Sequence, residues 1–157
     1  MIRRSDNVAM ALLVEKVGVE GIHRLYDELG VRVPDDGVPD ELTVRDYAAI
    51  FRILFNSSYL DRRSSERALD ELAHTEFSEG IVAPLPRSIP VAHKFGERRL
   101  PGRGEQQLHD CGIVYYPKVP YVLCVMSRGD DIDRLAGAIR TVSKAVFDEV
   151  SQQYPAK

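Results

Sequence analysis

The first half of the chain has apolar residues at helical spacing in four segments. The predicted helices span residues 7–17, 19–29, 43–58 and 64–75. Gly18 and Gly30 stand where the first two helices should end, and Thr43 is placed to cap the third. Residues 31–42 contain four acids, two prolines and a glycine without a period, so we expect a loop there.

The second half changes character after Pro84 and Pro86. It predicts strands at 90–95, 107–116 and 121–127, followed by a helix over 131–153. Residues 117–120 have the length of a hairpin connection. The expected fold class is therefore α+β, in one domain over 1–157: residues 1–86 are mostly helical, and residues 87–157 form a three-stranded antiparallel sheet with a long C-terminal helix packed on it.

The last predicted strand, 121–127, has apolar residues on both faces, as a central strand would. A sheet of three strands with one covering helix leaves a face and both edges in need of partners. We therefore expect an incomplete sheet, with self-association through its exposed edge as one outcome.

Composition narrows the class of protein. The chain has 157 residues, 44% of them apolar and 29% charged, with a net charge of −3. This balance is typical of a globular domain and gives no reason to expect nucleic acid as a partner. No stretch reaches the roughly 18 apolar residues of a membrane span, and the N-terminus does not look like a signal peptide.

The metal-binding and redox residues give weak signals. Cys111 and Cys124 are too few for a disulfide framework and lack zinc spacing, so we predict two buried strand residues. His93 and His109 have no third ligand at suitable spacing, which predicts no metal and no cofactor. A pair between His109 and Asp110 is disfavoured because adjacent strand residues point to opposite faces. The basic turn at 98–103 is either solvated or an anion-binding cluster.

Two short motifs carry the candidate chemistry. Ser5-Asp6-Asn7 stands at the start of the first helix, and Lys94-Phe95-Gly96 lies on the first strand. With a strand hairpin and a C-terminal helix after them, this order resembles the class A β-lactamase and penicillin-binding serine hydrolases, whose signatures are S-x-x-K, S-D-N and K-T-G. The resemblance covers essentially the whole chain, from the second signature onward.

The resemblance implies a role for each matching residue. Ser5 would pass a proton toward the leaving nitrogen while hydrogen bonded to Lys94, which would supply positive charge at the site. Asn7 would hold the amide side chain of the substrate, and Asp6 would bond nearby backbone. Gly96 would let the strand approach the acyl group closely. A purely structural alternative for Ser5 is the N-cap of the first helix.

The sequence departs from the family pattern at three points. Phe95 replaces the hydroxyl residue that contacts the substrate carboxylate. Glu41 is the nearest candidate for a deacylating glutamate, but the loop around it lacks the family's pattern. No serine is followed by a lysine three residues later, so the S-x-x-K nucleophile is absent from this chain. In the family that motif lies N-terminal to S-D-N, preceded by two strands and a helix, so we expect the C-terminal portion of such a fold.

These observations lead to two functional hypotheses. The first is a β-lactamase-like serine hydrolase, acylated by a β-lactam or a D-alanyl peptide amide, of which this chain alone is inactive. The alternative is a non-catalytic module that binds peptidoglycan or a protein. If Met1 is an internal methionine, in-frame sequence upstream should encode the S-x-x-K helix. Family analogy suggests a periplasmic or extracellular location.

Overall fold

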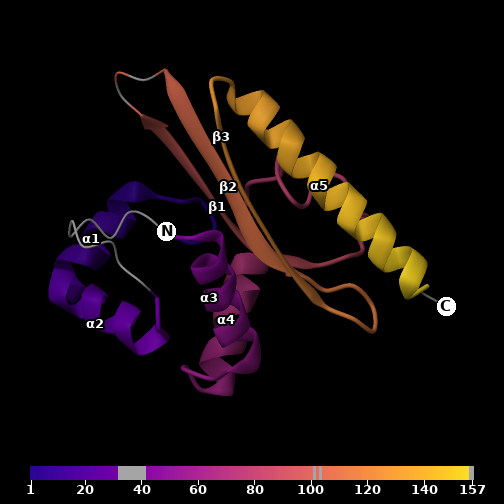
Figure 1. Cartoon of the computed structure of the whole chain (residues 1–157). Coiled ribbons are helices and arrows are strands. Elements are labelled where there is room, and N and C mark those ends of the chain that lie inside the picture. Colours follow the sequence, from indigo (N-terminus) through magenta and orange to yellow (C-terminus); the bar gives the residue numbers. More distant parts are fainter. Residues whose placement is uncertain (32–41, 101, 103, 156–157) are drawn as a thin grey trace.

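The computed structural model describes residues 1–31, 42–100, 102 and 104–155 (Figure 1). Its elements are α1 (Asn7–Val17), α2 (Val19–Leu29), α3 (Val44–Asn56), α4 (Arg62–Ala73), β1 (Val91–Leu100), β2 (Glu105–Val114), β3 (Tyr121–Gly129) and α5 (Ile132–Gln153). The predicted α+β class, a helical part followed by an antiparallel sheet and a long C-terminal helix, is confirmed. Residues 32–41, most of the predicted loop that includes Glu41, lie outside the described residues.

Local capping signals determine the helix ends. Helices α1 and α2 have the predicted bounds, and Gly30 ends α2 in the left-handed conformation with φ 67°. Thr43 caps α3 by accepting a hydrogen bond from the amide of Asp46 at 3.1 Å. The prediction for α4 was two residues late, because the cap is Asp61, whose carboxylate accepts from the amide of Ser64 at 2.9 Å.

The sheet has the order β1-β2-β3, and both neighbouring pairs are antiparallel. Lys94 lies opposite Cys111, which lies opposite Cys124, so these three residues share one face. The face partners Phe95, Asp110 and Val125 point the other way. Strand β2 ends at Val114, two residues earlier than predicted, so the connection to β3 is longer than the expected turn.

Helices cover the sheet on both faces (Figure 1). On one face α5 packs over a core with fully buried Ile81, Val114 and Ile139. On the other, α3 and α4 pack over a second core that includes Phe51, Ala92 and Cys111. Alternation along each strand therefore divides its side chains between two apolar layers.

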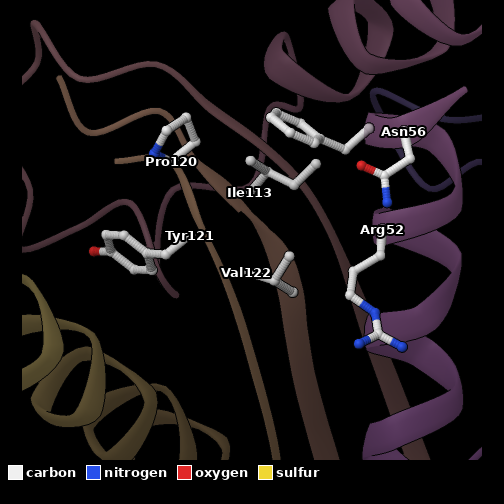
Figure 2. A pocket seen from close by; sticks show the side chains of 7 residues that line it. Arg52, Asn56, Ile113, Pro120, Tyr121 and Val122 are labelled. Atoms are coloured by element: carbon white, nitrogen blue, oxygen red, sulfur yellow. The ribbon is translucent and has the colours of Figure 1, made fainter. Parts of the chain in front are cut away.

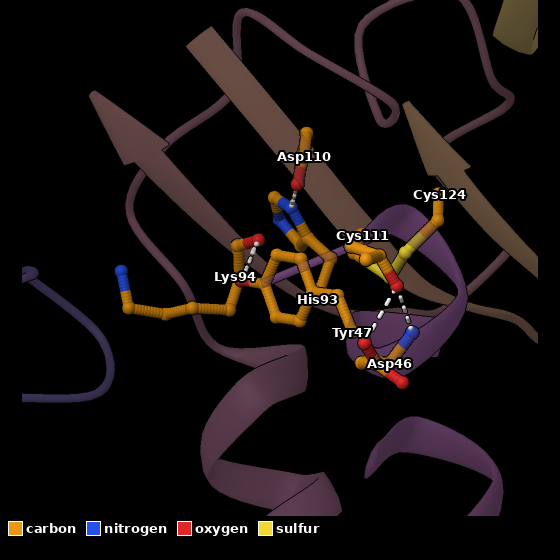
Figure 3. Close-up of a disulfide and its surroundings, with 8 residues drawn as sticks. Asp46, Tyr47, His93, Lys94, Asp110, Cys111 and Cys124 are labelled. Carbon is orange, nitrogen blue, oxygen red and sulfur yellow. Dashed lines mark hydrogen bonds and ion pairs between the residues drawn. A yellow bond between two sulfur atoms is a disulfide. The ribbon is translucent and has the colours of Figure 1, made fainter. Parts of the chain in front are cut away.

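The cysteines form a disulfide, which corrects the prediction of two unlinked buried residues. Cys111 of β2 and Cys124 of β3 are register partners on the α3 side of the sheet and are bonded to each other (Figure 3). Both lie on strands as predicted, and Cys111 is only 1% exposed. A cross-link between neighbouring strands fixes their register.

Helices α1 and α2 pack on each other at one side of α3 and α4 (Figure 1). Side-chain contacts connect this N-terminal region to the rest: Arg3 pairs with Glu71 at 2.8 Å, Arg4 with Glu76 at 2.7 Å, and the Tyr59 hydroxyl donates to Glu28. Neither helix contains a buried residue. None of the described helices has the length and apolarity to cross a membrane.

Candidate functional site

The two sequence motifs meet at a hydrogen bond between Ser5 and Lys94. The Lys94 ammonium donates to Ser5 Oγ at 2.7 Å across a separation of 89 residues, and also to the carbonyl oxygen of Phe95 at 2.6 Å. Ser5 precedes α1 with φ 51°, a left-handed conformation that is uncommon outside glycine. The backbone at Ser5 is therefore not helical, and its side chain points toward Lys94 of β1.

Lys94 occupies a partly buried position on β1. Burial lowers the pKa of its ammonium, and the nearby charge of Asp110 acts in the opposite direction and raises it. Within the described residues its hydrogen-bond partners are both neutral oxygens. The site therefore holds a cation that is easier to deprotonate than an exposed lysine.

Two hydroxyl groups hold the strand around Lys94. The Tyr47 hydroxyl, from α3, donates to the Lys94 carbonyl at 2.8 Å (Figure 3). The Thr75 hydroxyl donates to the His93 carbonyl, also at 2.8 Å. Burial, and secondarily the charge of Asp110, raises the pKa of Tyr47. The tyrosine therefore stays protonated and able to donate, and β1 is connected to α3 and to the segment after α4.

Asp6 and Asn7 begin α1. Asp6 is the N-cap: its carboxylate accepts from the amide of Ala9 at 3.0 Å, and this hydrogen bond lowers its pKa. The predicted backbone-bonding role of Asp6 thus corresponds to an observed contact. The N-cap of α1 is thus Asp6 and not Ser5. Asn7 is the first residue of the helix and is exposed.

Phe95 and Gly96 differ in how the rest of the chain surrounds them. The Phe95 ring stacks on Phe77 with centroids 4.1 Å apart, and the Lys94 ammonium lies 4.5 Å from the Phe95 centroid. A side chain at Gly96 would meet nothing within 4 Å. Packing within the described residues therefore does not require a glycine at position 96. The Phe95 ring, in contrast, packs against the core on the α5 side of the sheet and lies beside the Lys94 ammonium.

Several hollows in the described part of the chain lie away from the Ser5–Lys94 contact, and two of them border the sheet. One of about 220 Å³ lies between α3 and the start of β3, with Arg52, Asn56, Ile113, Pro120, Tyr121 and Val122 around it (Figure 2). A larger one of about 650 Å³ extends from Thr75 and Phe77 to His93. Neither of them includes Ser5 or Lys94 in its lining.

Sequence reasoning missed the partner of His93. Its Nδ1 lies 2.9 Å from Asp110 Oδ1, and both side chains are buried. These residues are diagonal neighbours on one face of the β1–β2 pair, which can be read only once the register is known. His109 points to the other face, and burial lowers its pKa. Among the described residues no group of three or more His, Cys, Asp or Glu is arranged to hold a metal ion.

Comparison with known proteins places the chain in a family. A model described as the Beta-lactamase enzyme family matches residues 1–150. No curated protein matches the sequence significantly.

Solved structures with the same fold include PBP-A (24% identity, TM-score 0.81, covering 97% of this chain and 59% of that one). A second is the TLA-3 extended-spectrum β-lactamase, with 20% identity and a TM-score of 0.79, covering 93% of this chain and 60% of that one. A third is a β-lactamase from Sphaerobacter thermophilus, with 22% identity and a TM-score of 0.75, covering 98% of this chain and 60% of that one. The chain thus spans about three fifths of the length of these proteins.

Proposed function

Because the chain belongs to the Beta-lactamase enzyme family, we propose that Ser5, Asn7 and Lys94 form one side of a serine-hydrolase site for β-lactams or D-alanyl peptide amides. The observation that carries this proposal is the 2.7 Å hydrogen bond from Lys94 Nζ to Ser5 Oγ, which joins the two motifs. One of the structures with this fold, a PBP-A variant, is an acyl-enzyme complex with penicillin G, and that chemistry is the model for the proposal.

The direction of this hydrogen bond fixes what Ser5 can do. An ammonium group only donates, so Ser5 Oγ accepts from Lys94 and its own hydrogen points elsewhere. A leaving nitrogen on the open side of Ser5 would receive that hydrogen, and Lys94 would replace it from its ammonium. The lowered pKa of Lys94 favours this second transfer.

The other site residues would shape the substrate's surroundings. Asn7 is exposed at the start of α1, where its amide could bond the amide side chain of a substrate. The open space beside Gly96 would admit the acyl group. Phe95 offers a ring in place of a hydroxyl, so recognition of a substrate carboxylate would depend on Lys94 and not on a hydroxyl at this strand position.

Acylation in this family uses the serine of the S-x-x-K signature, which this chain lacks. None of its serines is followed by lysine at the third position. We therefore propose that the 157-residue chain alone is not acylated, and that the covalent step requires an S-x-x-K serine from a segment that completes the fold. The Cys111–Cys124 disulfide supports a location outside the reducing cytoplasm.

The test has a covalent and a non-covalent part. Incubation with a fluorescent penicillin followed by intact-mass measurement should give no adduct, and an adduct on any residue would contradict the proposed inactivity.

In a titration of the isotope-labelled chain with penicillin G, amide resonances of Asn7, Lys94 and Gly96 should shift. Lys94→Met should abolish these shifts, whereas the matched variant Lys16→Met, at an exposed lysine of α1, should not. Shifts confined to the hollow at Tyr121 would contradict the site.

A binding module for peptidoglycan or a protein is the second candidate. It is favoured by Phe95, whose ring packs on Phe77 where a hydrolase of this family has a hydroxyl residue. Strand β3 pairs only with β2 within the described residues, so its other edge could accept a strand from a partner or a second copy. Co-sedimentation with purified peptidoglycan and sedimentation velocity of the chain alone would separate these outcomes from β-lactam binding.

A further inference from the structure

The aromatic ring of Phe95 has two close neighbours in the proposed site. The Lys94 ammonium lies over the ring, 4.5 Å from its centroid. The Phe77 ring stacks on it, with the two centroids 4.1 Å apart and the two planes inclined by 19°. The side chain that stands in place of the family's hydroxyl residue is thus in direct contact with the cation of the site.

The contact between Lys94 and Phe95 depends on the position of β1 at an edge of the sheet. Among the described residues, β1 pairs with β2 alone. Adjacent side chains of a strand leave it on opposite faces, and Phe95 packs against the core on the α5 side. The Lys94 ammonium nevertheless donates to the Phe95 carbonyl at 2.6 Å and to Ser5 Oγ at 2.7 Å. The lysine side chain therefore bends along the strand edge toward Phe95.

At this position the ammonium is partly removed from water. Burial lowers the pKa of Lys94, because it takes hydration from the charged form. The two hydrogen-bond acceptors of Lys94 among the described residues are neutral oxygens. The face of an aromatic ring is negative and attracts a cation within about 6 Å of its centroid, more strongly where water is excluded. The Phe95 ring therefore supplies an attraction that an aliphatic side chain of similar size does not.

One segment of the chain supports both the ring and Ser5. Phe77, which stacks on Phe95, directly follows Glu76. The Glu76 amide donates to the Arg3 carbonyl at 2.9 Å, and the Glu76 carboxylate pairs with Arg4 at 2.7 Å. Because these two arginines directly precede Ser5, the segment after α4 holds the aromatic stack and the approach to Ser5 in one arrangement.

We propose that Phe95 is a positioning residue whose ring binds the Lys94 ammonium by a cation–π contact and keeps it against Ser5. The ring acts through Lys94 and contacts no proposed substrate. The consequence for catalysis rests on the proposed function, in which Lys94 replaces the proton that Ser5 gives away. The contact itself can be measured without any substrate, so the two proposals can fail separately.

The experiment follows the Lys94 side chain by NMR, with its resonances assigned from Lys94→Arg. Protons over a ring face are shifted upfield, so the Cε protons of Lys94 should lie upfield of those of Lys16, an exposed lysine of α1. Phe95→Leu should move them to the Lys16 position and should speed the exchange of the ammonium hydrogens with water several-fold. Phe95→Tyr keeps the ring and should retain both wild-type properties.

A matched control separates the ring contact from packing. Phe55→Leu makes the same substitution at a ring of α3 that is 47% exposed, and it should change neither property of Lys94. Leucine at position 95 still offers an apolar side chain to Phe77. The loss of both Lys94 signals in Phe95→Leu and their rescue in Phe95→Tyr would therefore report the ring itself.

Three results would overturn the proposal: wild-type Lys94 protons without an upfield shift, a folded Phe95→Leu with wild-type exchange of the ammonium hydrogens, or a folded Phe95→Tyr without the shift. If Phe95→Leu does not fold, the shift in the wild-type chain and in Phe95→Tyr decides. Amides of Asn7 and Gly96 that do not respond to penicillin G, together with an upfield Lys94 signal, would contradict the proposed function and leave this contact in place.

Discussion

Helix α1 is richer in apolar residues than helix α5, yet it is the less buried of the two. Helix α5 places Leu135, Ala136 and Ile139 in the core, and Ile139 is fully buried. Helix α1 has apolar residues around most of its circumference, yet none is buried; Val8 is 72% exposed and Leu12 62%. A helix that is apolar all round is normally surrounded by protein. The comparison teaches that the C-terminal half contains enough packing partners to bury α5, whereas α1 packs on α2 without burying any of its residues.

Truncating one apolar side chain in each helix should give the largest difference. Ile139→Ala should lower the free energy of unfolding by roughly 2–5 kcal/mol, because it removes buried methyl groups and leaves a cavity. Leu12→Ala removes an exposed side chain and should change it by less than about 0.5 kcal/mol. Urea unfolding followed by circular dichroism measures both. Equal losses would mean that α1 is packed against something in solution, such as a second copy.

Breaking the disulfide of the sheet should have the next largest effect on the free energy of unfolding. The bond closes a short segment, because Cys111 and Cys124 have a sequence separation of 13. Replacing both by alanine should cost about 2–3 kcal/mol, chiefly because the unfolded chain gains freedom. Adding a reductant to the wild type should give the same loss, and the double variant should not respond to it. A reductant-sensitive double variant would show that the stability loss has another source.

Amide hydrogen exchange in the unmodified chain should be slower in α5 than in α1. Amides of α5 near Ile139 should exchange only on global unfolding, because this helix lies over the core. Amides of α1 should exchange faster by local opening, since no side chain there is buried. Mass spectrometry of peptides from the two helices measures the difference. Comparable protection would contradict the exposed position of α1.

The smallest expected effect concerns Tyr121, at the end of the sheet. Burial raises the pKa of its hydroxyl to about 12, from 10.0 for an unperturbed tyrosine. Between these values the unfolded chain loses the proton first, so stability should fall as the pH rises from 10 toward 12. Tyr121→Phe should reduce the slope of this fall in urea unfolding. An identical slope in the variant would show that other groups, such as Tyr47, account for it.

Elements with local signals could be predicted closely from the sequence. Helices α1 and α2 end at glycines that can adopt the left-handed conformation, and both pairs of bounds were correct. The cap of α4 was missed because Asp61, Ser64 and Ser65 all have capping side chains, and the sequence does not say which one bonds the first free amide. The motifs at Ser5 and Lys94 could be identified from order alone, but their 2.7 Å contact depends on how the whole chain folds.

Features that depend on register could not be predicted. The expected connection over 117–120 pairs Tyr116 with Tyr121 and sets Cys111 opposite Met126, a register that gives no sign of a disulfide. The actual pairing of Val114 with Tyr121 shifts the strands by two residues and brings the cysteines together. The same limit applies to His93 and Asp110, whose contact follows from a diagonal relation between two strands. The correct length of the β2–β3 connection would have revealed the disulfide, and the register of β1 against β2 would have revealed the His93–Asp110 contact.

The position of the disulfide has a consequence for how the chain responds to proteolysis. The exposed turn between β2 and β3 contains Lys118, with φ 74°, and lies inside the ring that Cys111 and Cys124 close. A trypsin cut after Lys118 would therefore open the ring without releasing either piece. On a denaturing gel without reductant, the nicked protein would migrate as one species, because the disulfide still joins the two fragments. A reductant would separate residues 1–118 from residues 119–157.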